Sequence, residues 1–157
     1  VEFVVRAEFG ASAVASPDPS FRDGVEQMDL TLAEDAPDVV VVAFGSNDIR
    51  GGHTPAEALT AYQQLAAQAE TAGVLPLLAL APPMGGTLPG DPLPLDTYNQ
   101  NLSALNDLIR GAFPADRVVD FWTPIVGATD FIDGIHVNAR GAAKRAMALY
   151  ERLLFAD

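Results

Sequence analysis

Apolar runs of strand length alternate along this chain with segments of helical periodicity. Residues 39–44 and 74–80 are nearly continuous apolar runs, which are typical of strands buried on both faces of a parallel sheet. Shorter runs of strand type lie at residues 1–5 and 118–121. A helix-periodic segment follows each of these runs. The order β, α, β, α, β, α, β, α therefore predicts a parallel sheet with helices on both faces, because right-handed crossovers join such strands.

The expected fold is an α/β fold with a doubly wound, flavodoxin-like parallel sheet in a three-layer α/β/α arrangement. The chain has 157 residues, of which 49% are hydrophobic and 19% are charged. This size and composition suit one domain over residues 1–157 with a substantial core, and leave little room for two. In such folds, functional residues lie at the carboxyl ends of the strands.

The first two helices are predicted from an apolar stripe and from a capping signal. The first helix ends near Asp35. The second follows a capping box in which Thr54 is the N-cap, Pro55 the first helical residue and Glu57 the third, and Gly73 ends it. The stripe of the first helix consists of Phe21, Val25, Met28 and Leu32.

The two later helices also have cap signals in the sequence. Asp96 is the predicted N-cap of the third helix, with Gly111 at its end, and Asn138 is the predicted N-cap of the last. Residues 82–94 between them are rich in Pro and Gly and have no periodicity, so we expect a long loop there. Loops of that length are often functional.

Composition excludes several classes of function. The chain has no cysteine, so disulfides, thiolate metal sites and cysteine nucleophiles are excluded. Its 21 acidic and 9 basic residues give a formal net charge of −12, which disfavours nucleic acid and anionic membranes as partners. No apolar run of about 18 residues is present, so we expect a soluble protein without a membrane span. The first residue is Val1 and no secretory signal is recognisable, so the compartment stays open.

Asp133 and His136 lie three residues apart, just before the last predicted helix. This spacing on a turn can bring the carboxylate to one nitrogen of the imidazole ring. Such a pair fixes the tautomer of the ring and stabilises the imidazolium that forms during acyl transfer. A surface histidine close to a helix cap is the alternative interpretation of the same pattern.

Two further positions follow predicted strands and can supply hydrogen-bond donors. Asn47 comes after the apolar run 39–44, where its side-chain amide can donate into a cleft at the edge of the sheet. Gly10 comes after the run 1–5, where a glycine lets the backbone N–H approach a ligand closely. A common Gly/Asn turn is the alternative for the first position, and any strand-to-helix turn is the alternative for the second.

Together these residues resemble the SGNH or GDSL-like hydrolases, a family of esterases and lipases. The resemblance rests on the segments around Gly10, the run Gly45-Ser46-Asn47-Asp48 and the run Asp133-Gly134-Ile135-His136, in this order and spacing. It implies a carboxylic ester hydrolase that acts through a Ser-His-Asp acyl-enzyme mechanism and needs no cofactor. In this family's pattern, His136 is the general base, Asp133 orients it, and Asn47 and Gly10 form the oxyanion hole.

The first block of the family, a Gly-Asp-Ser motif, has no counterpart in the sequence. The interpretation that we favour is that the nucleophile and the first, central strand of the sheet lie on a segment of the same protein upstream of Val1. We then expect a strand-wide slot between residues 1–5 and 39–44, or another peptide that fills it. Ser12 is an alternative nucleophile, and Ser46 is a poor candidate because its position varies in the family.

A second function of a different class is also compatible with the sequence. The chain can be an inactive remnant of the same fold that serves as a binding or interaction module. His53, the other histidine, is predicted to lie at a pocket rim or in solvent. Two histidines without cysteine give little basis for a metal site. The remaining partner that we expect is a small-molecule ester substrate.

Overall fold

A three-stranded parallel sheet forms the centre of the molecule. The structure is a computed structural model that describes residues 4–6, 10–15 and 23–154. The strands β1 (Val39–Val42), β2 (Leu75–Ala79) and β3 (Val118–Val119) lie in sequence order, with β2 in the middle. Val39 is paired with Leu75, and Leu78 with Val118.

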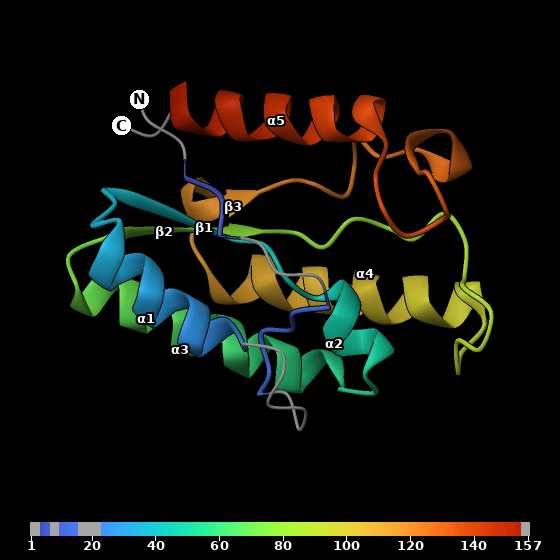
Figure 1. Cartoon of the computed structure of the whole chain (residues 1–157), viewed down its shortest axis with the longest axis horizontal. Helices are drawn as coiled ribbons and strands as arrows, with labels where there is room; N and C mark the ends of the chain where they lie inside the picture. Colours follow the sequence, from blue (N-terminus) through green and yellow to red (C-terminus); the bar gives the residue numbers. More distant parts are fainter. Residues whose placement is uncertain (1–3, 7–9, 16–22, 155–157) are drawn as a thin grey trace.

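Helices cover both faces of this sheet, as the alternation of strands and helices predicted. Figure 1 shows α1, α3 and α4 on one face and α5 on the other. Short 3-10 helices η1 (Ala115–Arg117) and η2 (Gly127–Asp130) lie before β3 and before the turn that leads to α5. The helices are α1 (Gly24–Glu34), α2 (Ser46–Arg50), α3 (Pro55–Thr71), α4 (Leu95–Ala112) and α5 (Ala139–Leu154). This is the predicted three-layer α/β/α arrangement.

The middle strand has core on both of its faces. Leu77 and Leu78 point to opposite faces because side chains alternate along a strand, and both are completely buried. Leu78 belongs to the larger cluster, which α3 and α4 complete with Tyr62, Leu65, Leu105 and Ile109. Leu77 belongs to a smaller cluster under α5. The strand β1 is less buried than predicted, because only Val42 is fully buried and residues 39–41 are half-buried.

The capping signal at Thr54 is confirmed. Its hydroxyl accepts a hydrogen bond from the Glu57 N–H at 3.3 Å, and the Glu57 carboxylate accepts one from the Thr54 N–H at 2.7 Å. Pro55 is the first residue of α3, and Gly73 follows the helix with a φ of 77°. The predicted loop is also confirmed, because residues 80–94 contain neither helix nor strand.

Two predictions about these elements are wrong, and a third is displaced by one residue. Asp96 is not the N-cap of α4, because the extended residue Pro94 takes that position and Asp96 lies in the first turn. Gly111 is inside this helix, which ends one residue later. Ser46–Arg50, where the sequence indicated no helix, is the short helix α2. The two longer strands are also shorter than their apolar runs, because pairing between β1 and β2 sets their length.

The expected strand at residues 1–5 falls partly outside the described residues, which include only Val4 and Val5 of it. These two valines lie in no strand and are 56% and 82% exposed. The adjacent Arg6 binds Glu34 and Asp35 at the end of α1, which holds this segment at the surface. Within the described residues, β1 therefore pairs with β2 alone, and its other edge has no strand beside it.

Candidate active site

The turn Asp133–His136 brings a carboxylate to an imidazole ring. Oδ2 of Asp133 lies 2.7 Å from Nδ1 of His136, so the expected hydrogen bond is present. Oδ1 of the same carboxylate accepts the N–H groups of Ile135 and His136 at 3.0 and 2.8 Å. The hydrogen bond from the His136 ring, with these backbone bonds, holds the pKa of the Asp133 carboxyl well below its usual range. The carboxylate is therefore ionised at neutral pH, which suits it to orient the ring.

This turn is the tip of a small hairpin that ends at α5. The N–H of Ile132 donates to the His136 carbonyl at 2.8 Å, and an antiparallel bridge joins Phe131 to Val137. The side chain of Asn138 accepts the N–H groups of residues 140 and 141 at the start of α5. The predicted cap at Asn138 is thus confirmed, and it fixes where the helix begins relative to His136.

Asp130 anchors the base of the hairpin, and no pattern in the sequence indicated this role. Its side chain is fully buried, accepts the Val126 N–H at 2.7 Å and binds Lys144 of α5 at 2.6 Å. Arg140 is 3.2 Å away. The Lys144 ammonium holds the pKa of the Asp130 carboxyl below its usual range. Lys144 is the only lysine of the chain, but nothing local in the sequence pairs it with a residue fourteen positions earlier.

Asn47 and Gly10 lie close together, beside the carboxyl end of β1. Gly45, which precedes α2, has a φ of 107°, and a Cβ there would lie 2.9 Å from the Ala81 side chain, so only glycine fits. One residue into α2, the Asn47 amide donates to the Ala11 carbonyl at 2.9 Å. This bond ties the residue to the segment that begins at Gly10.

A buried carboxylate joins the same two segments. Asp48 is completely buried, and its oxygens accept the N–H groups of Gly45 and Val14, each at 2.9 Å. Two hydrogen bonds, Val14 to Asp48 and Asn47 to Ala11, therefore hold residues 11–14 against the start of α2, and the bond from Gly45 fixes the Asp48 carboxylate. The spacing of the motif predicted Asn47 but gave no role to its neighbour Asp48.

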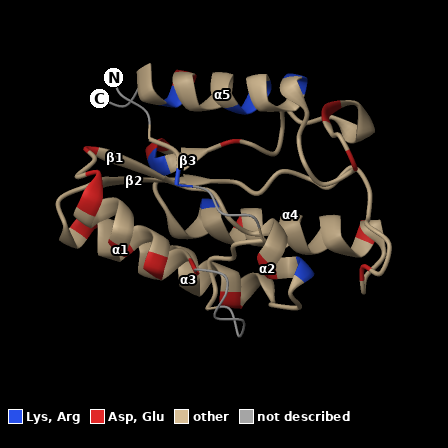
Figure 2. Cartoon of the chain, viewed as in Figure 1, with Lys and Arg blue, Asp and Glu red and all other residues tan. Residues whose placement is uncertain are grey.

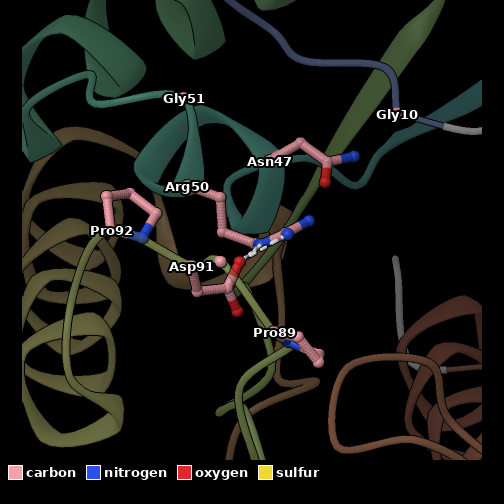
Figure 3. Close-up of a pocket in the computed structure, with 8 residues that line it drawn as sticks. Gly10, Asn47, Arg50, Gly51, Pro89, Asp91 and Pro92 are labelled. Carbon is pink, nitrogen blue, oxygen red and sulfur yellow. Dashed lines mark hydrogen bonds and ion pairs between the residues drawn. The ribbon is translucent and has the colours of Figure 1, made fainter.

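A hollow of about 360 Å³ opens next to these two donors (Figure 3). The loop of residues 82–94 forms its other wall. Its lining consists of Gly10, Asn47, Arg50, Gly51, Pro89, Gly90, Asp91 and Pro92. The two predicted oxyanion donors therefore share one hollow. His136 and Asp133 are not among the lining residues, and the expectation that His136 and Asn47 line one cleft stays a prediction.

The ion pair between Arg50 and Asp91 crosses the hollow and was not predicted from the sequence. Nη2 of Arg50 lies 2.6 Å from Oδ1 of Asp91, and Nε lies 3.1 Å from the same oxygen (Figure 3). Asp91 also accepts the Leu88 N–H at 2.6 Å. The Arg50 guanidinium holds the pKa of the Asp91 carboxyl below its usual range. The partners are 41 residues apart and one lies in an aperiodic loop, so no local pattern connects them.

The other polar candidates lie apart from this arrangement. The Ser12 hydroxyl donates to the Val14 carbonyl at 2.7 Å, and Ser46 is the first residue of α2. His53 is half-buried just before α3 and does not line the hollow. Over residues 4–6, 10–15 and 23–154, no group of three or more His, Asp or Glu side chains is placed to hold a metal ion. In the same residues, no helix has the length and apolar character needed to span a bilayer.

A model of the GDSL-like Lipase/Acylhydrolase family matches residues 3–144. This match covers most of the chain, and the chain therefore belongs to that family. No curated protein sequence matches it.

Several solved structures have a similar fold. A GDSL-like lipase from Bacteroides thetaiotaomicron superposes with a TM-score of 0.70 at 18% identity, over 85% of this chain and 71% of that one. The inhibitor-bound aryl esterase of M. smegmatis gives a TM-score of 0.73 at 20% identity, over 93% and 75%. A member of the lipolytic protein G-D-S-L family from Veillonella parvula gives 0.66 at 19% identity, over 82% and 75%. At these identities the similarity establishes the fold, which agrees with the family match.

Proposed function

We propose that this chain carries the base and the oxyanion hole of a carboxylic ester hydrolase that works through an acyl-enzyme. The observation that carries the proposal is the 2.7 Å hydrogen bond between Asp133 and His136 in a member of a hydrolase family. The hollow that Gly10 and Asn47 share also supports it. The substrate is a small-molecule ester.

In the proposed reaction, Nε2 of His136 takes the proton of a serine hydroxyl as the serine oxygen attacks the ester carbonyl. Asp133 keeps Nδ1 protonated and stabilises the imidazolium. The carbonyl π electrons move onto oxygen, and return when the C–O bond to the alcohol breaks. His136 gives its proton to that alcohol. Water then attacks the acyl-enzyme by the same route and releases the acid.

The geometry at Asn47 suits it to stabilise the oxyanion. A side-chain amide has two hydrogens, and one of them is used in the bond to the Ala11 carbonyl. This bond fixes the plane of the amide, so that the second hydrogen has a defined direction beside the hollow. The N–H of Gly10 is the proposed second donor. Donors that are fixed before the reaction stabilise a developing charge without reorganisation.

We propose that the serine nucleophile lies on a segment of the protein upstream of Val1. The Ser12 hydroxyl is held in a hydrogen bond to the Val14 carbonyl two residues away, which argues against its role as nucleophile. One edge of β1 has no described strand beside it. A further strand would pair along that edge. The second candidate function, an inactive binding module of the same fold, is favoured by one observation, that the sequence contains no Gly-Asp-Ser.

A first experiment tests the enzyme proposal directly. The protein with its upstream sequence restored should hydrolyse a short-chain aryl ester and be labelled by a fluorophosphonate on an upstream serine. The 157-residue chain alone should do neither. No hydrolysis and no labelling of the longer protein would favour the binding module. Activity of the chain alone that Ser12→Ala abolishes would make Ser12 the nucleophile.

A second experiment tests the oxyanion hole. Asn47→Ala should lower kcat of the longer protein by roughly 100-fold to 1000-fold, because one pre-oriented donor to the oxyanion is lost. Asn101→Ala is the matched control, since Asn101 lies on α4 and its side chain makes no hydrogen bond in the described part of the chain. An unchanged kcat in Asn47→Ala would contradict the assignment.

A further inference from the structure

We infer that the loop over residues 81–94 is a positioning bridge that sets His136 relative to Asn47. The loop is fastened at three places: along α4, to the turn that carries His136, and to α2 beside Asn47. The inference rests on the proposed function only for the chemical roles of His136 and Asn47. The bridge itself is defined by hydrogen bonds, and each can be tested without measuring hydrolysis.

Two asparagines of α4 hold the first part of the loop as a neighbouring strand would. Asn106 accepts the Ala81 N–H at 2.8 Å and donates to the Ala81 carbonyl at 2.9 Å. Asn99 makes the same pair of bonds with Met84, at 2.8 and 3.0 Å. Seven residues of helix rise about 10.5 Å, and three residues of extended chain span about 10 Å. The two spacings match, so the two asparagines of α4 fix how far apart Ala81 and Met84 lie.

The next two residues of the loop bind the His136 turn. The N–H groups of Gly85 and Gly86 both donate to the Gly134 carbonyl, at 2.8 and 3.0 Å. Gly134 has a φ of 90°, and a Cβ on it would lie 2.7 Å from the Cα of Gly86. The close approach is therefore possible only without a side chain at position 134. Because position 134 is between Asp133 and His136, this contact places the whole turn.

The far part of the loop is fastened to α2. Asp91 binds Arg50, which is three residues after Asn47 on the same short helix. Residues 86 and 91 are five apart, so this stretch of chain spans at most about 18 Å. The loop thereby limits the separation between the turn and α2. In Figure 1 it runs from β2 above α4, below the segment that leads into α5.

The bridge makes Asn99 a positioning residue although it belongs to neither half of the site. Asn99→Ala removes both bonds to Met84 and keeps a good helix former on α4, so the fold is retained. The chain has two histidines, and within the described residues the His53 side chain makes no hydrogen bond or ion pair with residues 81–94, so it serves as an internal reference. The ring signals of both histidines can be followed by NMR, with amide hydrogen exchange at Gly85 and Gly86.

We expect Asn99→Ala to speed exchange at Gly85 and Gly86 by about tenfold, because two hydrogen bonds that hold the segment are lost. The ring signals of His136 should shift and those of His53 should not. Asn101→Ala, the same substitution two residues along α4, should change neither. An unmoved His136 signal in Asn99→Ala, or equal shifts in both variants, would overturn the bridge.

A second pair of variants tests the glycine contact. Gly134→Ala should release Gly85 and Gly86 and displace the His136 ring signals. Gly90→Ala is the control, because Gly90, in the loop over residues 81–94, has the same φ of 90° but nothing within 4 Å of its would-be Cβ. Equal effects of both substitutions on the His136 signals would show backbone strain alone and refute the contact. These outcomes do not depend on hydrolysis, so an inactive longer protein would refute the proposed function and leave the bridge standing.

Discussion

The hydroxyl of Tyr62 joins the carboxyl ends of the two strands that lead into the site. It is fully buried on α3, accepts the Phe44 N–H at 2.9 Å, and lies 3.0 and 3.1 Å from the carbonyls of Phe44 and Ala79. A hydroxyl has one hydrogen, so it donates to one of these carbonyls at a time. Burial raises the pKa of this phenol, which therefore stays protonated. Phe44 directly precedes Gly45, so this one side chain fixes the start of the segment that carries Asn47.

Tyr62→Phe should lower the free energy of unfolding by about 1 to 3 kcal/mol, because it leaves the part-buried Phe44 N–H without its acceptor. Chemical denaturation measures this loss. Tyr150→Phe is the control, since Tyr150 is 58% exposed on α5 and its replacement should stay within about 0.5 kcal/mol. Similar losses in the two variants would mean that the hydroxyl does not fasten the strands.

At this scale, the sequence predicted contacts between near neighbours and missed those between distant residues. Asp133 and His136 are three positions apart, so a turn alone brings them together. The ion pair of Arg50 with Asp91 depends instead on where the loop passes α2. Only the folded arrangement of strands and helices determines that, and no spacing in the sequence encodes it. The roles of Asn47 and Gly10 stay predictions, although they share a hollow.

The N-cap of α3 should make a measurable contribution to stability. Thr54→Ala should cost about 1 kcal/mol of stability, because the Glu57 N–H and the Glu57 carboxylate both lose their hydroxyl partner. Thr60→Ala is the matched control on the same helix, since the Thr60 hydroxyl binds only the Ala56 carbonyl of its own helix and the residue is exposed. Its effect should stay within about 0.5 kcal/mol. Thermal unfolding of both variants decides the comparison.

Element boundaries were predictable where one local signal dominated. At Thr54, the capping box, the proline and the following apolar stripe all indicate the same first residue. Before α4, by contrast, Asp96 fits an N-cap and the first turn equally well, because a carboxylate is favourable at either position. Pro94, which is extended and cannot continue a helix backwards, decides the outcome. The length of β1 was overestimated because apolar composition does not show where pairing stops.

Across the whole molecule, acidic side chains lie on many elements, and basic ones gather on α5 (Figure 2). That helix carries Arg140, Lys144, Arg145 and Arg152, out of nine basic residues in the chain. Three of these four side chains make contacts within the fold. Lys144 and Arg140 bind Asp130, and Arg145 stacks on Phe121 with its guanidinium 4.7 Å from the ring centre. The basic groups thus hold α5 onto an otherwise acidic protein.

Pairing with basic groups also determines how stability should depend on pH. Four carboxyl groups have a pKa below the usual range because each is hydrogen-bonded to an arginine, a lysine or a histidine ring: Asp35, Asp91, Asp130 and Asp133. A group whose pKa is lower in the folded state stabilises the fold above its unfolded pKa, which is about 3.9 for Asp. That contribution is lost as pH falls toward the folded pKa. Neutralising the other carboxylates relieves repulsion, but at 0.15 M salt that repulsion is screened beyond about 8 Å.

The free energy of unfolding should therefore change little between pH 8 and pH 6 and fall progressively below about pH 5. The paired carboxyl groups have a higher pKa in the unfolded chain, so they take up protons when the chain unfolds at low pH. Urea denaturation across this range measures the slope. Asp130→Asn should reduce the slope, since the carboxylate that binds Lys144 is removed. Asp116→Asn is the control, because Asp116 is exposed and has neither an ion pair nor a hydrogen bond from its side chain within the described residues. A stability that rises toward pH 4, or equal slopes in the two variants, would mean that net charge and not these ion pairs governs the acid behaviour.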